Sequence, residues 1–254
     1  MNESAIIRAI RFYEGDTHGD DPFWGDPKGY CTLNALLFPG IENECARFRE
    51  GKRLNPAFLQ DIPRLLDLYA ALLNAFEPLA KGRSLTTTRV ERLSDYLLLK
   101  ELGRTVSFTS TSQDDFLSAY GDKQGLALMR FSIPEGTPCV VLAERLPEYR
   151  KADEAEALLP PDLPLLLEEI PLTDAQRRIV DLNGEPPVIS ARVKVHGAPR
   201  RTPRTAAFSG GADGPSAGVR VYAALNAGRE PDRADAEVYA RWKAALREWL
   251  LGPN

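Results

Sequence analysis

The stretch "VSFTSTSQDDF", residues 106–116, begins like a buried strand and then carries hydroxyl side chains almost without a break. Thr is common in strands, and Ser and Asp are common in the turns that end them, so one interpretation is a strand that runs into a turn. In the other interpretation one face of the strand lines a polar site, because alternate residues of a strand share a face. Ser110 and Ser112 would then point into that site together.

Several further segments have the composition of short strands, and turns such as "IPEGTP" separate them. We predict strands at residues 85–90, 105–112, 125–133, 137–144, 154–159, 163–170 and 188–196. Few helices lie between them. This pattern favours an antiparallel or mixed sheet over a doubly wound one.

Helical periodicity marks the first part of the chain and its end. A first helix carries Ile6, Ile10 and Tyr13 on one face, and Ser94 is expected to cap a short helix at residues 94–102. The clearest helix spans residues 61–80, with Pro63 in its first turn and an apolar stripe of Ile62, Leu65, Leu66, Tyr69, Leu72, Leu73 and Phe76. The last helix spans residues 232–251, with one face formed by Val238, Trp242, Ala245 and Trp249.

These patterns divide the chain into four parts. Residues 1–82 form a helical part and residues 83–198 the core of strands. Residues 199–218 are basic at first and then rich in Gly and Ser, which is typical of a flexible linker. Residues 219–254 are expected to hold a last strand and the last helix.

Composition excludes several classes of protein. The 254 residues suggest one large domain or two small ones, and the net charge of -4 gives no general attraction to nucleic acid or anionic lipid. The three Cys and two His include no CxxC pair and no zinc spacing, so we expect neither a disulfide framework nor a metal site. With no signal peptide and no apolar run of membrane length, we expect a cytoplasmic protein or one delivered without a conventional signal.

Three charged side chains are candidates for chemistry. Glu154 and Glu156 are two residues apart, so on a strand both carboxylates lie on one face. Two like charges there are unfavourable unless a cation or a polar site meets them, and the alternative is a solvated strand edge. Arg89 lies in the predicted strand 85–90. An arginine there is usually a surface residue, but it is also the side chain that can grip a diphosphate with two parallel hydrogen bonds.

These pieces follow one another in a defined order, as "TTTRV", "FTSTS", "IPEGTPCVVL" and "YRKADEAEALLPPDLPLLLEEI". In that order they resemble the ADP-ribosyltransferase family of arginine–serine–glutamate type, which includes clostridial Rho-modifying exoenzymes, binary actin-modifying toxins and vertebrate arginine-specific transferases. The resemblance covers residues 85–170. Family members commonly have an aromatic residue before the motif arginine and Gly after it, where this chain has Thr88 and Val90. Arg92 lies close by, so Arg89 and Arg92 are both candidates for the motif arginine.

The resemblance implies a fold and an activity. The fold would be α+β, with two small, mostly antiparallel sheets around an NAD cleft and a helical N-terminal part beside them. The activity would be NAD-dependent mono-ADP-ribosyl transfer, with NAD as the substrate and no metal. Arg89 would hold the phosphates or ribose of NAD, and Ser110 would steady Glu156. Glu156 would bond the nicotinamide ribose and stabilise the oxocarbenium-like charge as nicotinamide leaves.

The remaining residues implied by the resemblance surround this centre. Thr111 and Ser112 would line the NAD cleft with Ser110, and Phe116 would cover the nicotinamide from a mobile loop. Glu154 would face the acceptor, which the resemblance implies to be a protein side chain, with arginine favoured. Tyr149 would contact that acceptor from the preceding loop.

Two alternative functions stay open. The chain could be an NAD glycohydrolase, with water as the acceptor, or a catalytically inactive module that binds NAD or a partner. The sequence does not identify the acceptor, and we expect neither a membrane nor nucleic acid as a partner. A charge run beside a flexible linker is usually solvated, and we interpret in this way the run of Arg192, Lys194, Arg200, Arg201 and Arg204.

Overall fold

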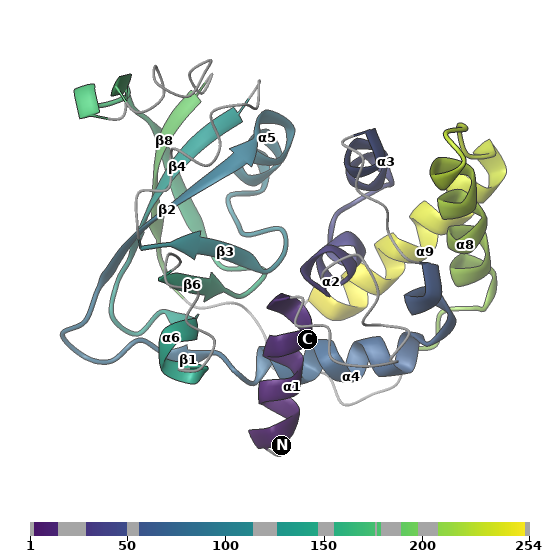
Figure 1. Ribbon diagram of the computed structural model, residues 1–254, viewed down its shortest axis with the longest axis horizontal. Coiled ribbons are helices and arrows are strands. Elements are labelled where there is room, and N and C mark those ends of the chain that lie inside the picture. The colour runs from purple at the N-terminus through teal and green to yellow at the C-terminus, as the bar shows by residue number, and fades with distance from the viewer. Residues whose placement is uncertain are drawn as a thin grey trace. The chain divides into compact units, whose positions relative to one another are not determined.

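The computed structural model describes residues 3–14, 29–49, 56–113, 126–146, 155–175, 177–178, 189–197 and 208–251. The chain forms two compact units. One is helical and combines Met1–Ala75 with Arg201–Asn254, and the other contains the sheet and comprises Phe76–Arg200. Figure 1 shows the helices of the first unit and the strands of the second.

The helical unit is assembled from helices near both ends of the chain. Its elements are α1 (Glu3–Glu14), α2 (Gly29–Leu37), α3 (Glu42–Arg49), the short 3-10 helix η2 (Pro56–Gln60), α4 (Ile62–Leu73), α8 (Asp213–Asn226) and α9 (Arg233–Leu251). Helix α1 packs against α2 and α4, while α8 packs against α9 and η2. The unit is therefore held together by contacts between segments that are far apart in the sequence.

Helices α1 and α4 show how far the sequence pattern predicted the buried residues and the ends of a helix. Ile6, Ile10 and Tyr13 are buried on α1, as predicted. Helix α4 has Pro63 in its first turn, but it ends at Leu73 and not near residue 80. Asn74 ends it, because its side chain donates a hydrogen bond of 2.6 Å to the carbonyl of Ala70. Phe76, predicted on the stripe of this helix, instead stacks on Phe108 in the sheet unit, with ring centroids 5.9 Å apart.

Helices α8 and α9 correct two predictions about the end of the chain. Helix α8 begins at Asp213, inside the predicted linker, and a helix stands where a strand was expected after residue 218. Its glycines allow close packing, since a Cβ at Gly214 would lie 2.0 Å from Cγ of Trp242. The buried face of α9 was also predicted wrongly in part, because Ala245 is exposed. Trp242 is buried as expected, and the buried residues are Tyr239, Trp242, Lys243, Leu246 and Leu250.

A buried ion pair explains why that face contains a lysine. The side chains of Lys243 and Glu44 are fully buried, and Nζ of Lys243 lies 2.5 Å from Oε1 of Glu44. Lys243 also donates to the carbonyl of Gly40 at 2.7 Å. The hydroxyls of Tyr222 and Tyr239 lie 3.3 Å and 3.4 Å from the same Glu44 oxygen. This cluster joins α3 to α8 and α9 by hydrogen bonds inside the helical unit.

The sheet unit contains one continuous mixed sheet. Its strands are β1 (Glu77–Pro78), β2 (Leu85–Arg92), β3 (Thr109–Ser112), β4 (Leu126–Ile133), β5 (Pro138–Val141), β6 (Glu156–Leu159), β7 (Leu165–Glu169) and β8 (Ile189–Val195). The order is β1-β5-β6-β3-β2-β4-β8-β7, and β4 and β8 run parallel while the other neighbours are antiparallel. Each predicted strand segment contains a strand of this sheet, but the strand predicted at residues 105–112 begins only at Thr109, and the one predicted at 137–144 ends at Val141, where a short helix follows. The α+β class is confirmed.

The prediction of two small, mostly antiparallel sheets is wrong. A single residue pair, Thr88 opposite Ser112, joins β2 to β3 and makes the sheet continuous. In Figure 1, β3 and β6 run across the direction of β2, β4 and β8. The sheet therefore turns at this one pair and remains one sheet.

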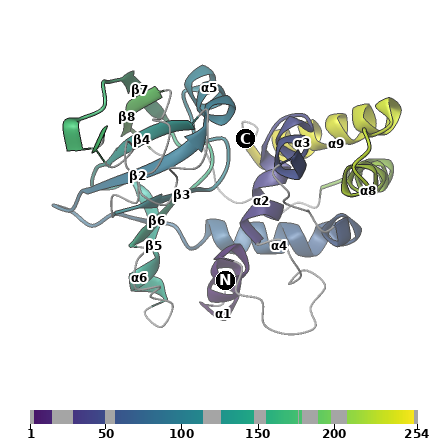
Figure 2. The same ribbon diagram turned by 45° about the horizontal axis from the view of Figure 1, so that its top comes forward.

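Helix α5 (Leu93–Leu102) packs against β2 and β4, and both ribbon views show it beside these strands (Figures 1 and 2). Ser94 does not cap it, because the N-cap is Arg92, which makes no side-chain cap bond. Tyr96 is buried and donates to Oε1 of Glu169 on β7 at 3.2 Å. Burial, aided by this hydrogen bond, raises the pKa of Tyr96 to about 12. A second short helix, α6 (Leu142–Arg145), follows β5.

Candidate functional site

Strand β3 separates its hydroxyls between two faces. Thr109 and Thr111 are buried, and their hydroxyls donate to main-chain oxygens: Oγ1 of Thr111 to Ala157 at 2.8 Å and Oγ1 of Thr109 to Ser107 at 3.0 Å. Ser110 and Ser112 are half-buried and lie on the other face, as the period of two requires. The two serines are therefore the hydroxyls of this strand that are available to a site on that face.

Glu156 begins β6 directly opposite Ser112, while Ser110 lies opposite Leu158. Directly opposed residues share a face, with Cβ atoms about 5 Å apart, so Ser112 and Glu156 are side by side. Only 8% of Glu156 is exposed, although carboxylates are seldom buried. The structure thus places a buried carboxylate next to the second serine of the pair, and the first serine one step further along the same face.

The side chain of Arg89, on β2, is hydrogen-bonded to the main chain of β3, the strand that carries Ser110 and Ser112. Gln113 donates its amide to the carbonyl of Ala155 at 2.8 Å, so the odd-numbered residues of β3 direct their main-chain groups towards β6. The carbonyl of Ser110 therefore points towards β2. Strands β2 and β3 are paired at Thr88 and Ser112, two residues beyond Ser110. Nη1 of Arg89 donates to the Ser110 carbonyl at 2.7 Å. The guanidinium takes the place of a ladder hydrogen bond between the two strands.

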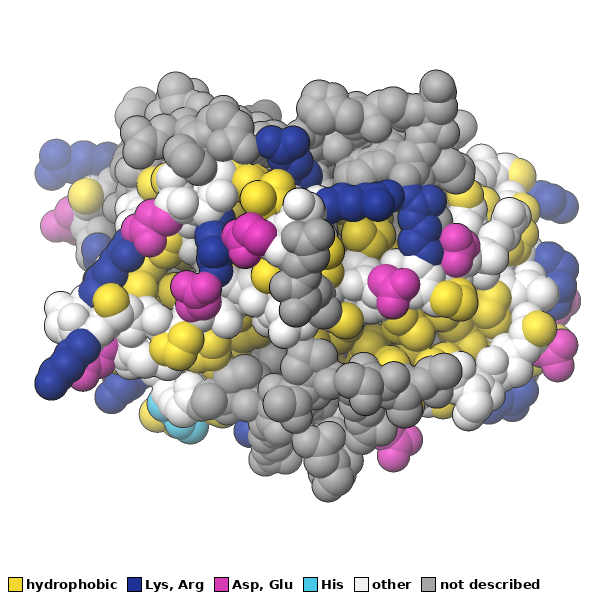
Figure 3. Space-filling model, turned by 90° about the horizontal axis from the view of Figure 1, so that it is seen from below, with side chains coloured by type: hydrophobic (Ala, Val, Ile, Leu, Met, Phe, Trp, Pro, Cys, Tyr) yellow, Lys and Arg dark blue, Asp and Glu magenta, His cyan; other side chains and the backbone are white. Residues whose placement is uncertain are grey.

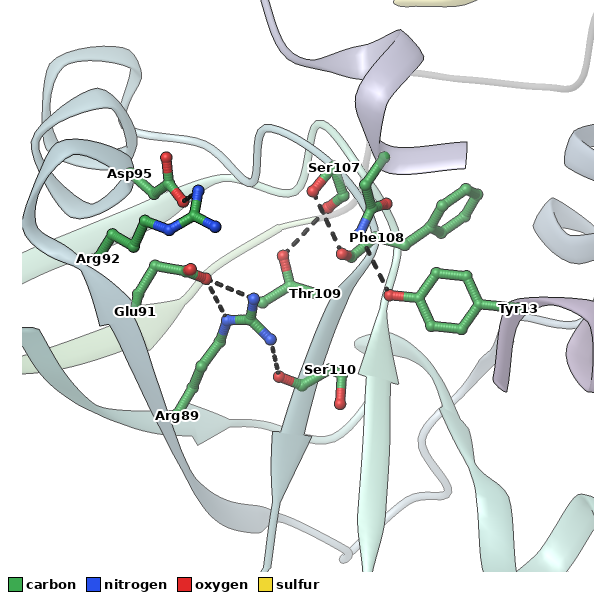
Figure 4. Close-up of polar contacts among 10 residues, drawn as sticks. Tyr13, Arg89, Glu91, Arg92, Asp95, Ser107, Phe108, Thr109 and Ser110 are labelled. Atoms are coloured by element: carbon green, nitrogen blue, oxygen red, sulfur yellow. Dashed lines mark hydrogen bonds and ion pairs between the residues drawn. The ribbon is translucent and has the colours of Figure 1, made fainter. Parts of the chain in front are cut away.

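Glu91 is a residue of this site that the sequence analysis did not identify. Nε of Arg89 donates to Oε2 of Glu91 at 2.5 Å, and Nη2 of Arg89 forms an ion pair with the same oxygen. The two side chains are 26% and 15% exposed. Figure 4 shows Arg89 held between Glu91 and the Ser110 carbonyl. The signal was present in the sequence, because residues two apart share a face of a strand.

Arg92, the second candidate for the motif arginine, has a different environment. Its Nη1 lies 3.8 Å from Oδ2 of Asp95, in the first turn of α5. Figure 4 shows it directed to Asp95, while Arg89 is directed to Ser110. Arg89 is hydrogen-bonded to the main chain of β3 through the Ser110 carbonyl.

Three residues predicted for the site, Glu154, Tyr149 and Phe116, lie outside the described residues. The basic run is described only in part. Arg192 and Lys194 are exposed on β8, and Nη1 of Arg192 lies 3.3 Å from Glu168 on β7. Figure 3 shows both basic and acidic side chains among those drawn in colour.

Two further features, a metal-binding cluster and a membrane-spanning helix, are absent from the described residues. No group of three or more His, Cys, Asp or Glu residues there is arranged to hold a metal ion. In the same part of the chain, none of the helices has the length and apolar character needed to span a bilayer.

Comparison with known proteins places the chain beside solved structures only, since no protein-family model and no curated protein matches it. An ADP-ribosyltransferase from Clostridium botulinum is 13% identical, over 75% of this chain and 86% of its own, with a TM-score of 0.43. A protein from S. aureus, solved with NAD, is 15% identical over 76% of this chain and 87% of its own, with a TM-score of 0.41. An ADP-ribosyltransferase toxin from Paenibacillus larvae is 12% identical over 77% and 96%, with a TM-score of 0.35. The chain is thus similar to solved structures of bacterial ADP-ribosyltransferases.

Proposed function

We propose that the protein is an NAD-dependent mono-ADP-ribosyltransferase. It would transfer ADP-ribose from NAD to an acceptor, with a protein arginine favoured, and release nicotinamide. One observation carries the proposal: the buried carboxylate of Glu156 is in register with the serine face of β3, and Arg89 is bound to the same strand. These are the glutamate, the serines and the arginine of the motif that the sequence resembles.

Arg89 is suited to the diphosphate of NAD. A guanidinium is a planar, always charged group that binds phosphate oxygens in pairs. The side chain is partly exposed and lies where the β2–β3 ladder stops, so a ligand can meet it between the strands. Its bond to the Ser110 carbonyl keeps it within reach of the strand that carries the serines.

Glu156 is suited to the bond that breaks. When the bond between the ribose C1′ and the nicotinamide nitrogen is cleaved, its electron pair leaves with nicotinamide and positive charge develops on the ribose. A fixed carboxylate in a water-poor site stabilises such a charge, as carboxylates do in glycosidases. The acceptor nitrogen then donates a lone pair to C1′ and loses a proton. Glu156 would also bond a ribose hydroxyl, with Ser112 and Ser110 beside it on the same face.

Release of nicotinamide from NAD, with and without an arginine ester as acceptor, tests this function directly. Glu156→Gln keeps the size of the side chain and removes its charge, so the rate should fall about a hundredfold to a thousandfold with little change in NAD affinity. Glu168→Gln is the matched control, because Glu168 is a 67% exposed strand carboxylate paired with Arg192. Near-normal release by Glu156→Gln would contradict the proposal.

Glu154→Gln separates transfer from hydrolysis in the same assay. We expect it to lower transfer to the arginine ester while some hydrolysis of NAD persists, because water can still reach the same cation. Equal loss of both reactions would remove the acceptor role proposed for Glu154.

A further inference from the structure

We infer that Glu91 is a positioning residue, which orients Arg89 to receive the diphosphate of NAD. The inference rests on the proposed function, because it assigns a task to Arg89. It concerns a residue outside the motif that the sequence resembles, and it follows from the contacts in Figure 4.

A long arginine side chain needs restraint to be useful for binding. Free in solvent it samples many rotamers, and their loss on binding weakens the complex for each side chain that becomes fixed. Glu91 and the Ser110 carbonyl restrain Arg89 from two directions. Glu91 binds the Nε and Nη2 side of the guanidinium, and Ser110 binds Nη1. Two contacts on different nitrogens fix both the position and the plane of the group.

The two restraints differ in kind. The Ser110 carbonyl belongs to the main chain of β3, so no side-chain substitution removes it directly. Glu91 is a side chain, and it is two residues from Arg89 on the same strand face. Its carboxylate is 15% exposed, so its attraction to the guanidinium is less screened than that of a surface pair. Glu91 is therefore the part of the restraint that mutation can test.

A carboxylate near a diphosphate has an opposite effect as well, because like charges repel. If Glu91 acted mainly as a competitor for the guanidinium, its neutralisation would tighten NAD binding. Positioning predicts the reverse. The sign of the change in affinity therefore distinguishes the two roles.

The experiment measures the dissociation constants of NAD and ADP by calorimetry for wild type and Glu91→Gln. We expect both constants to rise by about tenfold, within the range of coupling between contacting residues, and by the same factor, because both ligands carry the diphosphate. The kcat for nicotinamide release should stay within about twofold, since a lost ground-state contact acts on KM. Glu91→Asp, which keeps the charge near the guanidinium, should stay within about threefold of wild type.

A double-mutant cycle shows whether Glu91 acts through Arg89. In the Arg89→Lys background, Glu91→Gln should have no further effect, because the planar fork that it orients is gone. Glu168→Gln serves as the control carboxylate and should leave both affinities unchanged, and equal melting temperatures exclude a general loss of structure.

The possible failures can be told apart. Unchanged or tighter NAD binding by Glu91→Gln, or a full additional loss in the Arg89→Lys background, overturns the positioning role and leaves the proposed function intact. A wild-type protein that binds neither NAD nor ADP overturns both.

Discussion

Ser112 and Glu156 lie directly opposite each other on neighbouring strands, and Ser110 lies opposite Leu158. The resemblance assigns the steadying of Glu156 to Ser110, whereas the register brings Ser112 closest to it. We expect Ser112→Ala to lower the rate of nicotinamide release more than Ser110→Ala, by roughly the factor of ten that one hydrogen bond to a charged group represents. Parallel kinetics of the two variants test this. A larger loss with Ser110→Ala would return the role to the first serine.

The two candidate arginines should behave differently when each is changed to lysine. Arg89→Lys replaces a fork with a point charge at the contact with β3, so NAD affinity should fall by about tenfold or more. Arg92→Lys keeps a cation near Asp95 and should leave NAD affinity within about twofold. Calorimetric titration with NAD measures both. Reversed results would identify Arg92 as the motif arginine.

The buried pair of Lys243 and Glu44 makes a strong prediction about stability. Lys243→Met leaves the Glu44 carboxylate buried without its cation, which should lower the free energy of unfolding by about 3–5 kcal/mol. The double change of Lys243→Met with Glu44→Leu should recover much of the loss, because neither charge then remains buried. Trp242 and Trp249 lie on α9 of the helical unit, so tryptophan fluorescence in urea reports its unfolding. A loss below about 1 kcal/mol for the single change would contradict this account.

Alkaline pH should destabilise the sheet unit through Tyr96. The pKa of Tyr96 is raised to about 12 in the folded state, against about 10 in an unfolded chain. Below pH 10 both states keep the proton and stability is complete. Between pH 10 and 12 the unfolded state releases the proton and the folded state retains it, so the free energy of unfolding falls as pH rises. Tyr96→Phe should reduce this slope in urea titrations followed by circular dichroism, and an unchanged slope would refute the assignment.

Much of the sheet could be predicted because its signals are local. Strand β4 alternates buried and exposed residues from Met129 to Ile133, and β8 does so from Ala191 to Val195. Such alternation follows from the period of two. Whether the sheet is continuous depends on the pairing of Thr88 with Ser112, which are far apart in the sequence. No local pattern contains that information.

The helical unit was harder to predict, because the contacts that hold it together do not follow the local sequence pattern. Lys243 lies in the buried stripe of α9, where a lysine is normally read as a surface residue, and its partner Glu44 is distant in sequence. Gly214 suggested a linker, although the absence of its Cβ is what lets Trp242 pack against α8. In the site, Arg89, Ser112 and Glu156 were predicted from motif order. The sequence places Glu91 on the same strand face as Arg89, but it does not show that the two side chains are in contact.

The helical unit is interrupted in the chain by the whole of the sheet unit, and this sets an order for folding during synthesis. Ribosomes add about 5–20 residues per second, and domains fold as they emerge. Residues 76–200 are contiguous, so the sheet unit is complete before α8 and α9 exist. Glu44, in contrast, is made long before Lys243, so α3 remains without its cation until α9 leaves the ribosome. The sheet unit can therefore fold on the nascent chain, whereas the helical unit closes only after translation of residue 243.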